Sequence, residues 1–395
     1  MTSRGWAVLV AALTSMGAGR ILGLEDLYLV GAGLLLICVF AIAYVRVLRP
    51  DLSATRRVLP ARVYAGGSSR VELSLVNRGR RSSPVLSVQD PFDRGARWAR
   101  FLVAPLRPEE VARAAYRLPT DRRGLYDLGP LQVAVTDPFG LATRTVEAAP
   151  QTRLTVFPHI DLIAPPPSSN GDDPLAGADH PRALTGGGED FYALRPYVRG
   201  DDLRKVHWPS TARTGEMMLR QDEMPWQARS IIVVDVRTAT CPAPALELVV
   251  SAAASIVSAA AHHDGLQRLI TTAGFDSRAG AGTGHTEAIL EHLAGVRAST
   301  GTIVTALSTL RRSQAGGALV VVTTGLATAA DLQSLAALRT RYAGVTVVVF
   351  DQSAWTGVSA AGSPTPTVRG VRFVRVGNGH PFAQAWDGLA VGARR

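Results

Sequence analysis

The polar residues best placed for chemistry lie between Gly188 and Glu223, directly before an apolar strand predicted over 230–236. Asp201, Asp202 and His207 are the group in this segment that could support hydrolysis, with the imidazole as general base. No Ser or Cys stands near His207 in a recognisable nucleophile motif, and adjacent aspartates on a turn usually point in different directions. A hydrolytic site is therefore an alternative and not the main expectation.

The same segment is rich in Arg, Tyr and Trp, the residue types that dominate interface hot spots, which favours a docking surface. A structural role is equally compatible: Asp201 or Asp202 would cap a short helix from Leu203, and the arginines would pair with carboxylates. Trp208 would then be a packing anchor between two domains, with Pro209 ending the turn. Both interpretations rest on eight residues: Arg195, Tyr197, Arg199, Gly200, Asp201, Arg204, Trp208 and Arg213.

These residues resemble the signature of a bacterial family known as domain of unknown function 58, which combines Arg-x-Tyr, Gly-Asp, an Arg, a Trp and a final Ala-Arg. The stretches 123–126, 129–130 and 137–141 are also similar to that family. The resemblance implies an N-terminal membrane hairpin, a β-rich middle and a domain like von Willebrand factor type A. It implies no agreed activity, and it suggests a MoxR-type AAA+ ATPase as partner.

Type A domains commonly bind a divalent cation through Asp-x-Ser-x-Ser, a Thr and a later Asp, at the carboxyl ends of their strands. Asp235 is present in this chain, but Arg237 and Ala239 stand at the two serine positions. Thr302 could serve as the threonine, and Thr324 stands where the later Asp is expected. Because a guanidinium keeps its charge, Arg237 would occupy the place of the cation and pair with Asp235. We therefore expect a degenerate metal site and no cofactor.

Strands and helices alternate over 229–395. The strands are continuous apolar runs, as in a sheet covered on both faces, and are predicted over 230–236, 266–272, 318–323, 345–350 and 371–376. The helices are predicted over 243–263, 286–293, 302–312, 329–342 and 381–391. This alternation predicts a doubly wound α/β sheet, which is the fold class of the expected type A-like domain.

The region 49–160 reads as a small antiparallel β-sandwich. Residues 70–76 alternate polar with apolar, the period of a half-buried strand. Further short runs between turn signals are 85–88, 113–118, 131–135 and 153–157. Residues 161–187, rich in Pro, Gly, Ser and Asp, predict a flexible linker before the signature segment, 188–228.

Two apolar segments predict a transmembrane hairpin over 1–48. Residues 27–45 carry no charge and are about long enough to span the hydrocarbon core. A first span is long enough if Arg20 snorkels to the interface, so that the helices cover about 5–24 and 27–47 with Glu25 and Asp26 as the connection. The alternative is a cleaved signal peptide with Arg4 as its charged start.

Composition argues against nucleic-acid binding and a disulfide framework. The net charge is +10, but only Lys205 among the 42 basic residues is a lysine, and aromatic residues, 6% of the chain, do not interleave with arginine clusters. Cys38 and Cys241 fit two buried thiols, and no Cys/His spacing resembles a zinc site. A reducing, cytoplasmic setting fits these features best.

The main expectation is a membrane-anchored, cytoplasm-facing, non-enzymatic scaffold or adaptor with two spans in the inner or plasma membrane. It would act with a protein partner, and the resemblance points to the MoxR-type ATPase. One alternative is a membrane-bound hydrolase centred on Asp201, Asp202 and His207. A second is a metal-dependent ligand-binding protein, which the degenerate motif disfavours.

Orientation gives a first testable prediction. Arg46, Arg49, Arg56 and Arg57 follow the second span, against Arg20 alone near the hairpin turn, so the residues after Arg46 should be cytoplasmic. A reporter that is active only outside the cytoplasm should stay silent when fused after Arg395. Strong reporter activity would reverse the orientation.

Overall fold

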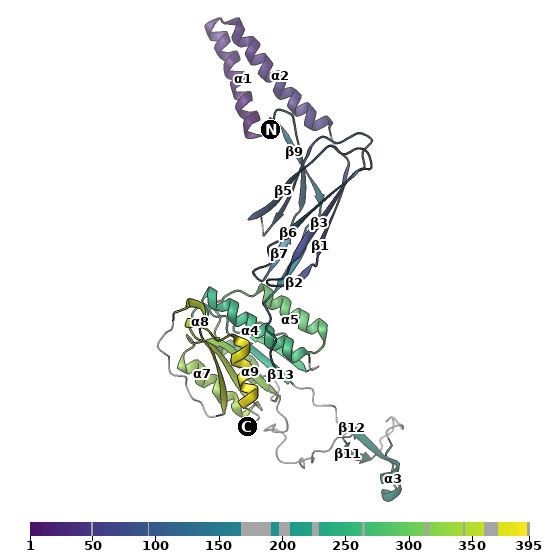
Figure 1. The fold of residues 1–395 in the computed structure, drawn as a ribbon, viewed down its shortest axis with the longest axis vertical. Helices are drawn as coiled ribbons and strands as arrows, with labels where there is room; N and C mark the ends of the chain where they lie inside the picture. The colour runs from purple at the N-terminus through teal and green to yellow at the C-terminus, as the bar shows by residue number, and fades with distance from the viewer. Residues whose placement is uncertain are drawn as a thin grey trace. The chain divides into compact units, whose positions relative to one another are not determined.

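The computed structural model describes residues 1–48, 50–93, 95–166, 191–196, 206–222, 229–262, 265–312, 316–342, 344–358 and 370–392. The chain divides into two compact units, Met1–His159 and Ile160–Arg395. Figure 1 shows both, coloured from the N-terminus in purple to the C-terminus in yellow. Each unit is considered by itself.

Unit one begins with two long helices, α1 (Ser3–Leu22) and α2 (Glu25–Val47). Both are long and apolar enough to cross a membrane, with mean hydropathy of 1.4 and 2.5. Helix α4 (Ala243–Ala261) meets the same criteria, but 67% of its apolar window is buried in the protein, against 17% and 22% for α1 and α2. The first two helices therefore leave their apolar side chains for lipid, as a membrane anchor requires.

Small residues bring α1 and α2 close together. A Cβ on Gly31 would lie 2.4 Å from the side chain of Met16 and 2.9 Å from the carbonyl oxygen of Ala12. The hydroxyl of Ser15 donates to the carbonyl of Leu27 at 2.9 Å, a type of contact that joins helices in lipid. The connection lies two residues earlier than expected: Gly23 closes α1 in the left-handed region, and Glu25 and Asp26 already belong to the first turn of α2.

The β-rich region of unit one consists of two sheets around one core. The first sheet is antiparallel, in the order β1 (Leu52–Leu59), β3 (Ser69–Asn77), β6 (Val111–Leu118). The second runs in the order β2 (Arg62–Tyr64), β10 (Thr152–Phe157), β7 (Gly124–Leu128), β4 (Leu86–Phe92), β8 (Leu131–Thr136), β9 (Thr143–Ala149), and β5 (Arg97–Val103) pairs with β4. All pairs are antiparallel except β2 with β10. Inward-facing apolar residues of both sheets form the core, including Val71, Leu86 and Val133.

A buried ion pair lies inside this sandwich. The Arg56 guanidinium donates to Asp90 at 2.6 Å, and these side chains are 1% and 0% exposed. Tyr116 donates to the same carboxylate at 2.7 Å. Burial, and then the hydrogen bond to Asp90, raises the pKa of the Tyr116 hydroxyl well above its usual range. Arg56, which the sequence places with the arginines that flank the membrane helices, is therefore a core residue of the sandwich.

The motif around Gly129 serves this ion pair. Arg56 also donates to the carbonyl of Leu128 at 2.9 Å, and Gly129 follows with φ of 89°. A Cβ on Gly129 would lie 2.5 Å from the Arg56 guanidinium. Glycine is therefore required both for the backbone conformation and for the close approach of the chain to the buried charge.

Unit two contains a five-stranded parallel sheet, as the alternation predicts. Its order is β14 (Leu266–Thr271), β13 (Arg229–Val234), β15 (Ala318–Thr324), β16 (Gly344–Phe350), β17 (Val371–Val376). Besides α4, the helices that alternate with these strands are α5 (Thr283–Gly295), α6 (Ile303–Arg312), α7 (Ala329–Ala336), α8 (Ser353–Thr356) and α9 (Phe382–Gly392), with a 3-10 turn over Ala337–Thr340.

Both faces of this sheet are covered. Ile231 and Val233 lie in one apolar cluster with residues of α6 and α7, such as Leu307 and Leu335. The alternate residues of β13, Ile232 and Val234, are also fully buried, and α4 contacts β13, β14, β15 and β16. The first residues of the predicted linker join this unit: Asp161 N–H donates to the Ser255 hydroxyl, and Trp386 Nε1 donates to the Ala164 carbonyl. The rest of that linker lies outside the described residues.

The buried ion pair gives a second prediction. Asp90→Asn leaves the Arg56 guanidinium buried without a carboxylate, which should cost about 3–5 kcal/mol of local stability. Hydrogen exchange of the full chain in detergent should show this loss in the amides of β1 and β4. The matched control is Asp127→Asn, because Asp127 and its partner Arg153 are 32% and 58% exposed and should contribute less than about 1 kcal/mol. Equal losses in the two variants would contradict the assignment.

Candidate functional site

The strand order places a switch point between β13 and β15. Chain order reverses there, because β13 connects outward to β14 on one side while β15, β16 and β17 follow on the other. In open α/β sheets, ligands bind in the crevice outside the carboxyl ends of the strands at such a point. Asp235 directly follows β13, and Thr323 and Thr324 end β15. The residues that the metal motif singled out at these two strand ends therefore lie at the switch point.

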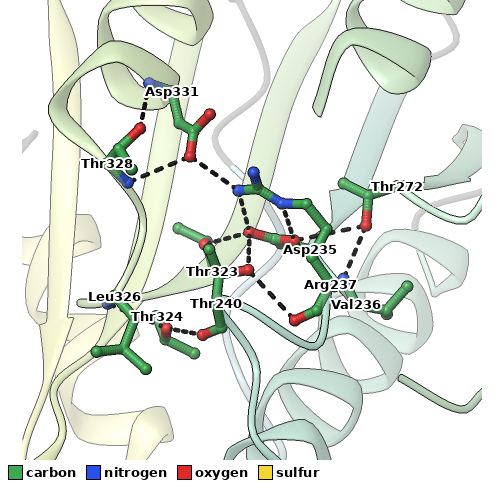
Figure 2. Close-up of polar contacts among 10 residues, drawn as sticks. All are labelled: Asp235, Val236, Arg237, Thr240, Thr272, Thr323, Thr324, Leu326, Thr328 and Asp331. Carbon is green, nitrogen blue, oxygen red and sulfur yellow. Dashed lines mark hydrogen bonds and ion pairs between the residues drawn. The ribbon is translucent and has the colours of Figure 1, made fainter. Parts of the chain in front are cut away.

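Asp235 is a buried carboxylate whose oxygens are already fully engaged (Figure 2). Its side chain is 1% exposed. Oδ1 accepts from Arg237 Nε at 2.9 Å, and Oδ2 accepts from Arg237 Nη2 at 2.8 Å. The hydroxyls of Thr240 and Thr323 each donate to Oδ2 at 2.9 Å, and Thr272 lies 3.4 Å from Oδ1. The ion pair between Asp235 and Arg237 that the sequence predicts is confirmed.

Arg237 also reaches across the switch point to a residue that sequence reasoning missed. Its Nη2 donates to Oδ2 of Asp331 at 3.0 Å. Asp331 lies in the first turn of α7 and forms a capping box with Thr328. The guanidinium therefore joins the loop after β13 to the loop after β15, as Figure 2 shows. The pattern Thr328-Ala-Ala-Asp331 before an apolar run could have revealed the cap, but not the contact with Arg237.

The charges of this network stabilise one another. The hydrogen bond with Asp235, helped by that with Asp331, raises the pKa of Arg237 above its usual range, although burial acts to lower it. Burial raises the pKa of Asp331, but the bonds from Arg237 and Thr328 outweigh it and hold that pKa below its ordinary value. The stabilisation from ionised Asp331 is therefore present above the pKa of an unfolded aspartate, about 4, and is lost as pH falls through the lower folded pKa.

The donor set at this point does not fit a divalent cation. A carboxylate offers about four lone-pair positions, and those of Asp235 are directed to the guanidinium and hydroxyl donors. Ala239 is exposed and carries no ligand atom, and Thr324 accepts from Leu326 N–H and donates to the Thr240 carbonyl. Thr302 lies 3.3 Å from the Thr305 hydroxyl, and among the described hydrogen bonds none joins it to Asp235. The guanidinium is the cation of this site.

The second candidate region is the signature segment. The described part contains an antiparallel pair, β11 (Phe191–Pro196) and β12 (Met218–Asp222), and a short helix, α3 (Trp208–Thr214). Arg195 lies in β11, opposite Leu219 in β12, and Trp208 and Arg213 lie in α3. The other predicted members lie outside the described residues: Tyr197, Arg199, Gly200, Asp201, Asp202 and Arg204. The predicted helix from Leu203 also begins there.

His207 caps α3. The ring atom Nδ1 accepts from the Ser210 backbone N–H at 3.3 Å and lies 2.9 Å from the Ser210 hydroxyl. The backbone N–H of His207 donates to the Met218 carbonyl at 2.8 Å. Pro209 is in the first turn of α3, where its missing N–H is harmless, so it begins a helix instead of ending a turn. The Nδ1 atom of His207 therefore holds the start of a helix.

Trp208 differs from the packing anchor that the structural interpretation expects. Its side chain is 68% exposed, and none of the residues of α3 is buried. Arg213, one turn and a half further along the same helix, is exposed as well. A tryptophan with most of its surface in water is typical of an interaction site, because the ring loses the benefit of burial until a partner covers it.

Removing the guanidinium gives a third prediction. Arg237→Met leaves two buried carboxylates without their cation and should lower the stability of the α/β unit by about 3–5 kcal/mol. The measurement is hydrogen exchange of β13 and β15 amides in the full chain. Arg375→Met is the matched control, since Arg375 and its partner Asp351 are 33% and 28% exposed and should contribute less than about 1 kcal/mol. A loss as small as the control's would mean that the network is not a stabilising one.

Two solved domains illustrate the similarity of this chain to known structures, at low identity and low TM-score. The CARDB domain of the PF1109 protein from Pyrococcus furiosus, solved in complex with di-metal ions, is 17% identical, with 28% of this chain and 94% of that chain covered and a TM-score of 0.23. A domain of a putative cell surface protein from Methanosarcina acetivorans is 18% identical over 28% and 94% of the two chains, with a TM-score of 0.21. No curated protein matches the sequence.

A family model matches the part of the chain that holds both candidate regions. The match covers residues 193–355, from β11 through the signature segment and the switch point to α8, and the family is described as "Protein of unknown function DUF58". The family that the signature residues resemble is therefore confirmed by this match. Residues 193–355 of this chain are thus similar to the DUF58 family of proteins of unknown function.

Proposed function

We propose that this chain is a membrane-anchored scaffold that binds a protein partner through α3, by way of Trp208 and Arg213. The observation that carries the proposal is the 68% exposure of Trp208 on a helix without a single buried residue. Tryptophan and arginine are both enriched in interface hot spots, and α3 exposes one of each. The cap by His207 and the Gly215 C-cap hold this helix in a defined shape before any partner arrives.

Binding in this proposal needs no metal. The position at the switch point that a cation would take is filled by the Arg237 guanidinium, held between Asp235 and Asp331. A guanidinium stays charged at any relevant pH and does not dissociate as a metal ion can. The parallel sheet with residues of this kind at its carboxyl edge supports a type A-like architecture with a permanent internal cation.

The partner class comes from the family resemblance: an AAA+ ATPase of the MoxR type. The soluble units would face the cytoplasm, where such an ATPase is found, in line with the arginine bias after the second span. The hairpin would hold the scaffold at the membrane, and α3 would present Trp208 and Arg213 to the partner. Acidic side chains are the expected counterpart on the partner, since Arg213 would otherwise lose its hydration without compensation.

Loss of the exposed tryptophan gives a fourth prediction. Trp208→Ala should weaken capture of the purified MoxR-type ATPase of the same organism by full-length protein in detergent, by about thirtyfold, because a hot-spot residue contributes at least about 2 kcal/mol. Arg213→Glu should weaken it further, because like charges then face each other. Thermal unfolding should not change, since both side chains are exposed.

Matched controls are Trp98→Ala, which removes a 41% exposed tryptophan of β5, and Arg311→Glu, which reverses an exposed arginine of α6. Neither should alter capture. Equal capture by the parent and the Trp208→Ala variant would remove α3 as the docking element. No capture by the parent itself would remove the ATPase as the partner.

A further inference from the structure

Residues 137–141, which form most of the loop between β8 and β9, pack against the start of α1 and the end of α2, here called the foot of the hairpin. The hydroxyl of Thr2 donates to the Gly140 carbonyl at 2.7 Å, and Thr2 N–H donates to the Leu141 carbonyl at 2.9 Å. Gly5 lies so close that a Cβ there would be 2.0 Å from the Leu141 oxygen. Leu141 and Ala142 share a buried apolar cluster with Ala41 and Val45 of α2. The loop is thus joined to both ends of the hairpin.

Phe139, at the tip of this loop, points along α2 and not into the sandwich. Its ring lies 6.3 Å from the ring of Phe40, edge to face, and the two side chains are 55% and 51% exposed. The uncharged run of α2 ends at Val45, and Phe40 lies five residues before that end. Five residues of a helix correspond to roughly 7–8 Å along its axis. If α2 spans the bilayer, Phe139 reaches the boundary between headgroups and acyl chains.

The backbone of this loop is prepared for an apolar surrounding. Asp137 is 3% exposed, and its carboxylate accepts from Phe139 N–H at 2.9 Å and from Ala142 N–H at 2.5 Å. Gly140 N–H donates to the Asp137 carbonyl, Asp137 N–H donates to the Ala142 carbonyl, and Thr2 satisfies the carbonyls of Gly140 and Leu141. Pro138 has no N–H to satisfy. Unpaired polar groups are what normally exclude loops from lipid, and these pairings remove much of that cost.

The charged residues around the foot of the hairpin also favour a position of the loop at the membrane surface. Arg4 in the first turn of α1 and Arg46 in the last turn of α2 are both exposed. Arginines at this level are suited to lipid phosphates, while their stems cover apolar surface. Exposed aromatic residues together with exposed arginines are a combination found in segments that lie in the membrane interface.

We propose that the loop 137–141 is a third membrane contact of this protein, inserting Phe139 into the acyl boundary of the bilayer that α1 and α2 cross. The occupant of this apolar surface is lipid. The loop would hold the sandwich at a fixed height and tilt on the membrane, because it is bonded to both ends of the hairpin and continues into β8 and β9. This inference depends on membrane anchoring and not on the partner of α3.

The test is to measure lipid depth at position 139 in the full chain. Phe139→Cys is labelled with an environment-sensitive fluorophore and reconstituted into vesicles of phosphatidylcholine and phosphatidylglycerol. The parent chain gives the background, since both of its cysteines are buried. We expect emission shifted to shorter wavelength and quenching by lipids that carry a spin label near the headgroup, with little quenching by aqueous iodide.

Two labelled positions calibrate the result. Trp98→Cys is the aqueous control, because Trp98 is 41% exposed and pairs with Pro91, at the end of β5 far from the loop. The other end of β5, Val103, lies near the loop: it pairs with Leu86, and Leu86 pairs with Val135 beside the loop. Trp98 therefore lies about 17 Å further from the loop end, at 3.3 Å per residue. Leu36→Cys, 69% exposed in the middle of α2, is the control for deep lipid.

Position 139 behaving like position 98 while position 36 reports deep lipid would overturn the proposal. Water exposure at position 36 would overturn it as well, because the hairpin would then not be inserted. Since Phe139→Cys removes the ring that contacts Phe40, a second variant carries photoreactive benzoylphenylalanine at 139. Irradiation should attach lipid to it, and the same residue at position 98 should form no lipid adduct. Absence of a lipid adduct at 139 would also contradict insertion.

Discussion

The ion pair between Asp235 and Arg237 is the interaction on which the α/β unit depends. A carboxylate that is 1% exposed is costly at the end of an apolar strand unless a cation and hydrogen-bond donors surround it. Arg237 supplies the charge, and Thr240 and Thr323 supply donors from two different strand ends. Because the guanidinium also donates to Asp331, it links the loops after β13 and β15 to each other. At the edge where sheets of this type bind ligands, the chain therefore holds its own guanidinium.

The sandwich solves a similar problem in the same way. Arg56 and Asp90 are buried between its sheets, Tyr116 donates to the Asp90 carboxylate, and the carbonyl of Leu128 accepts from Arg56. In both units an arginine pairs with an aspartate across elements distant in sequence, which fixes those elements relative to one another. Trp208 in α3 and Phe139 in the β8–β9 loop are in contrast largely exposed in the part of the chain that the structure describes. The buried charges give each unit its shape, and the exposed aromatic residues are where we expect it to meet a partner or lipid.

Much of the architecture could be predicted from local patterns. The uncharged run 27–45 and the continuous apolar strands of the parallel sheet are strong signals, and the structure has a helix and strands there. Strands β1, β2, β5, β7 and β9 were not predicted, because each is short or rich in arginine and polar residues, so its period is weak. The turn between α1 and α2 was placed two residues late, since Gly23 and not the acidic pair supplies the left-handed conformation.

For the candidate site, the sequence by itself determined the chemistry of one contact: an Asp and an Arg two residues apart after a strand must pair when no water can replace either. Through the signature residues it also indicated the family whose model matches residues 193–355, and it determined the apolar character of the two N-terminal helices. Only the tertiary structure decided that Asp331 is the second partner of Arg237, that His207 caps a helix, and that Trp208 is exposed. The reason is physical: Asp331 is 94 residues from Arg237, and strand order alone brings the two loops together. Local spacing fixes what a residue can do, whereas packing fixes which groups it meets.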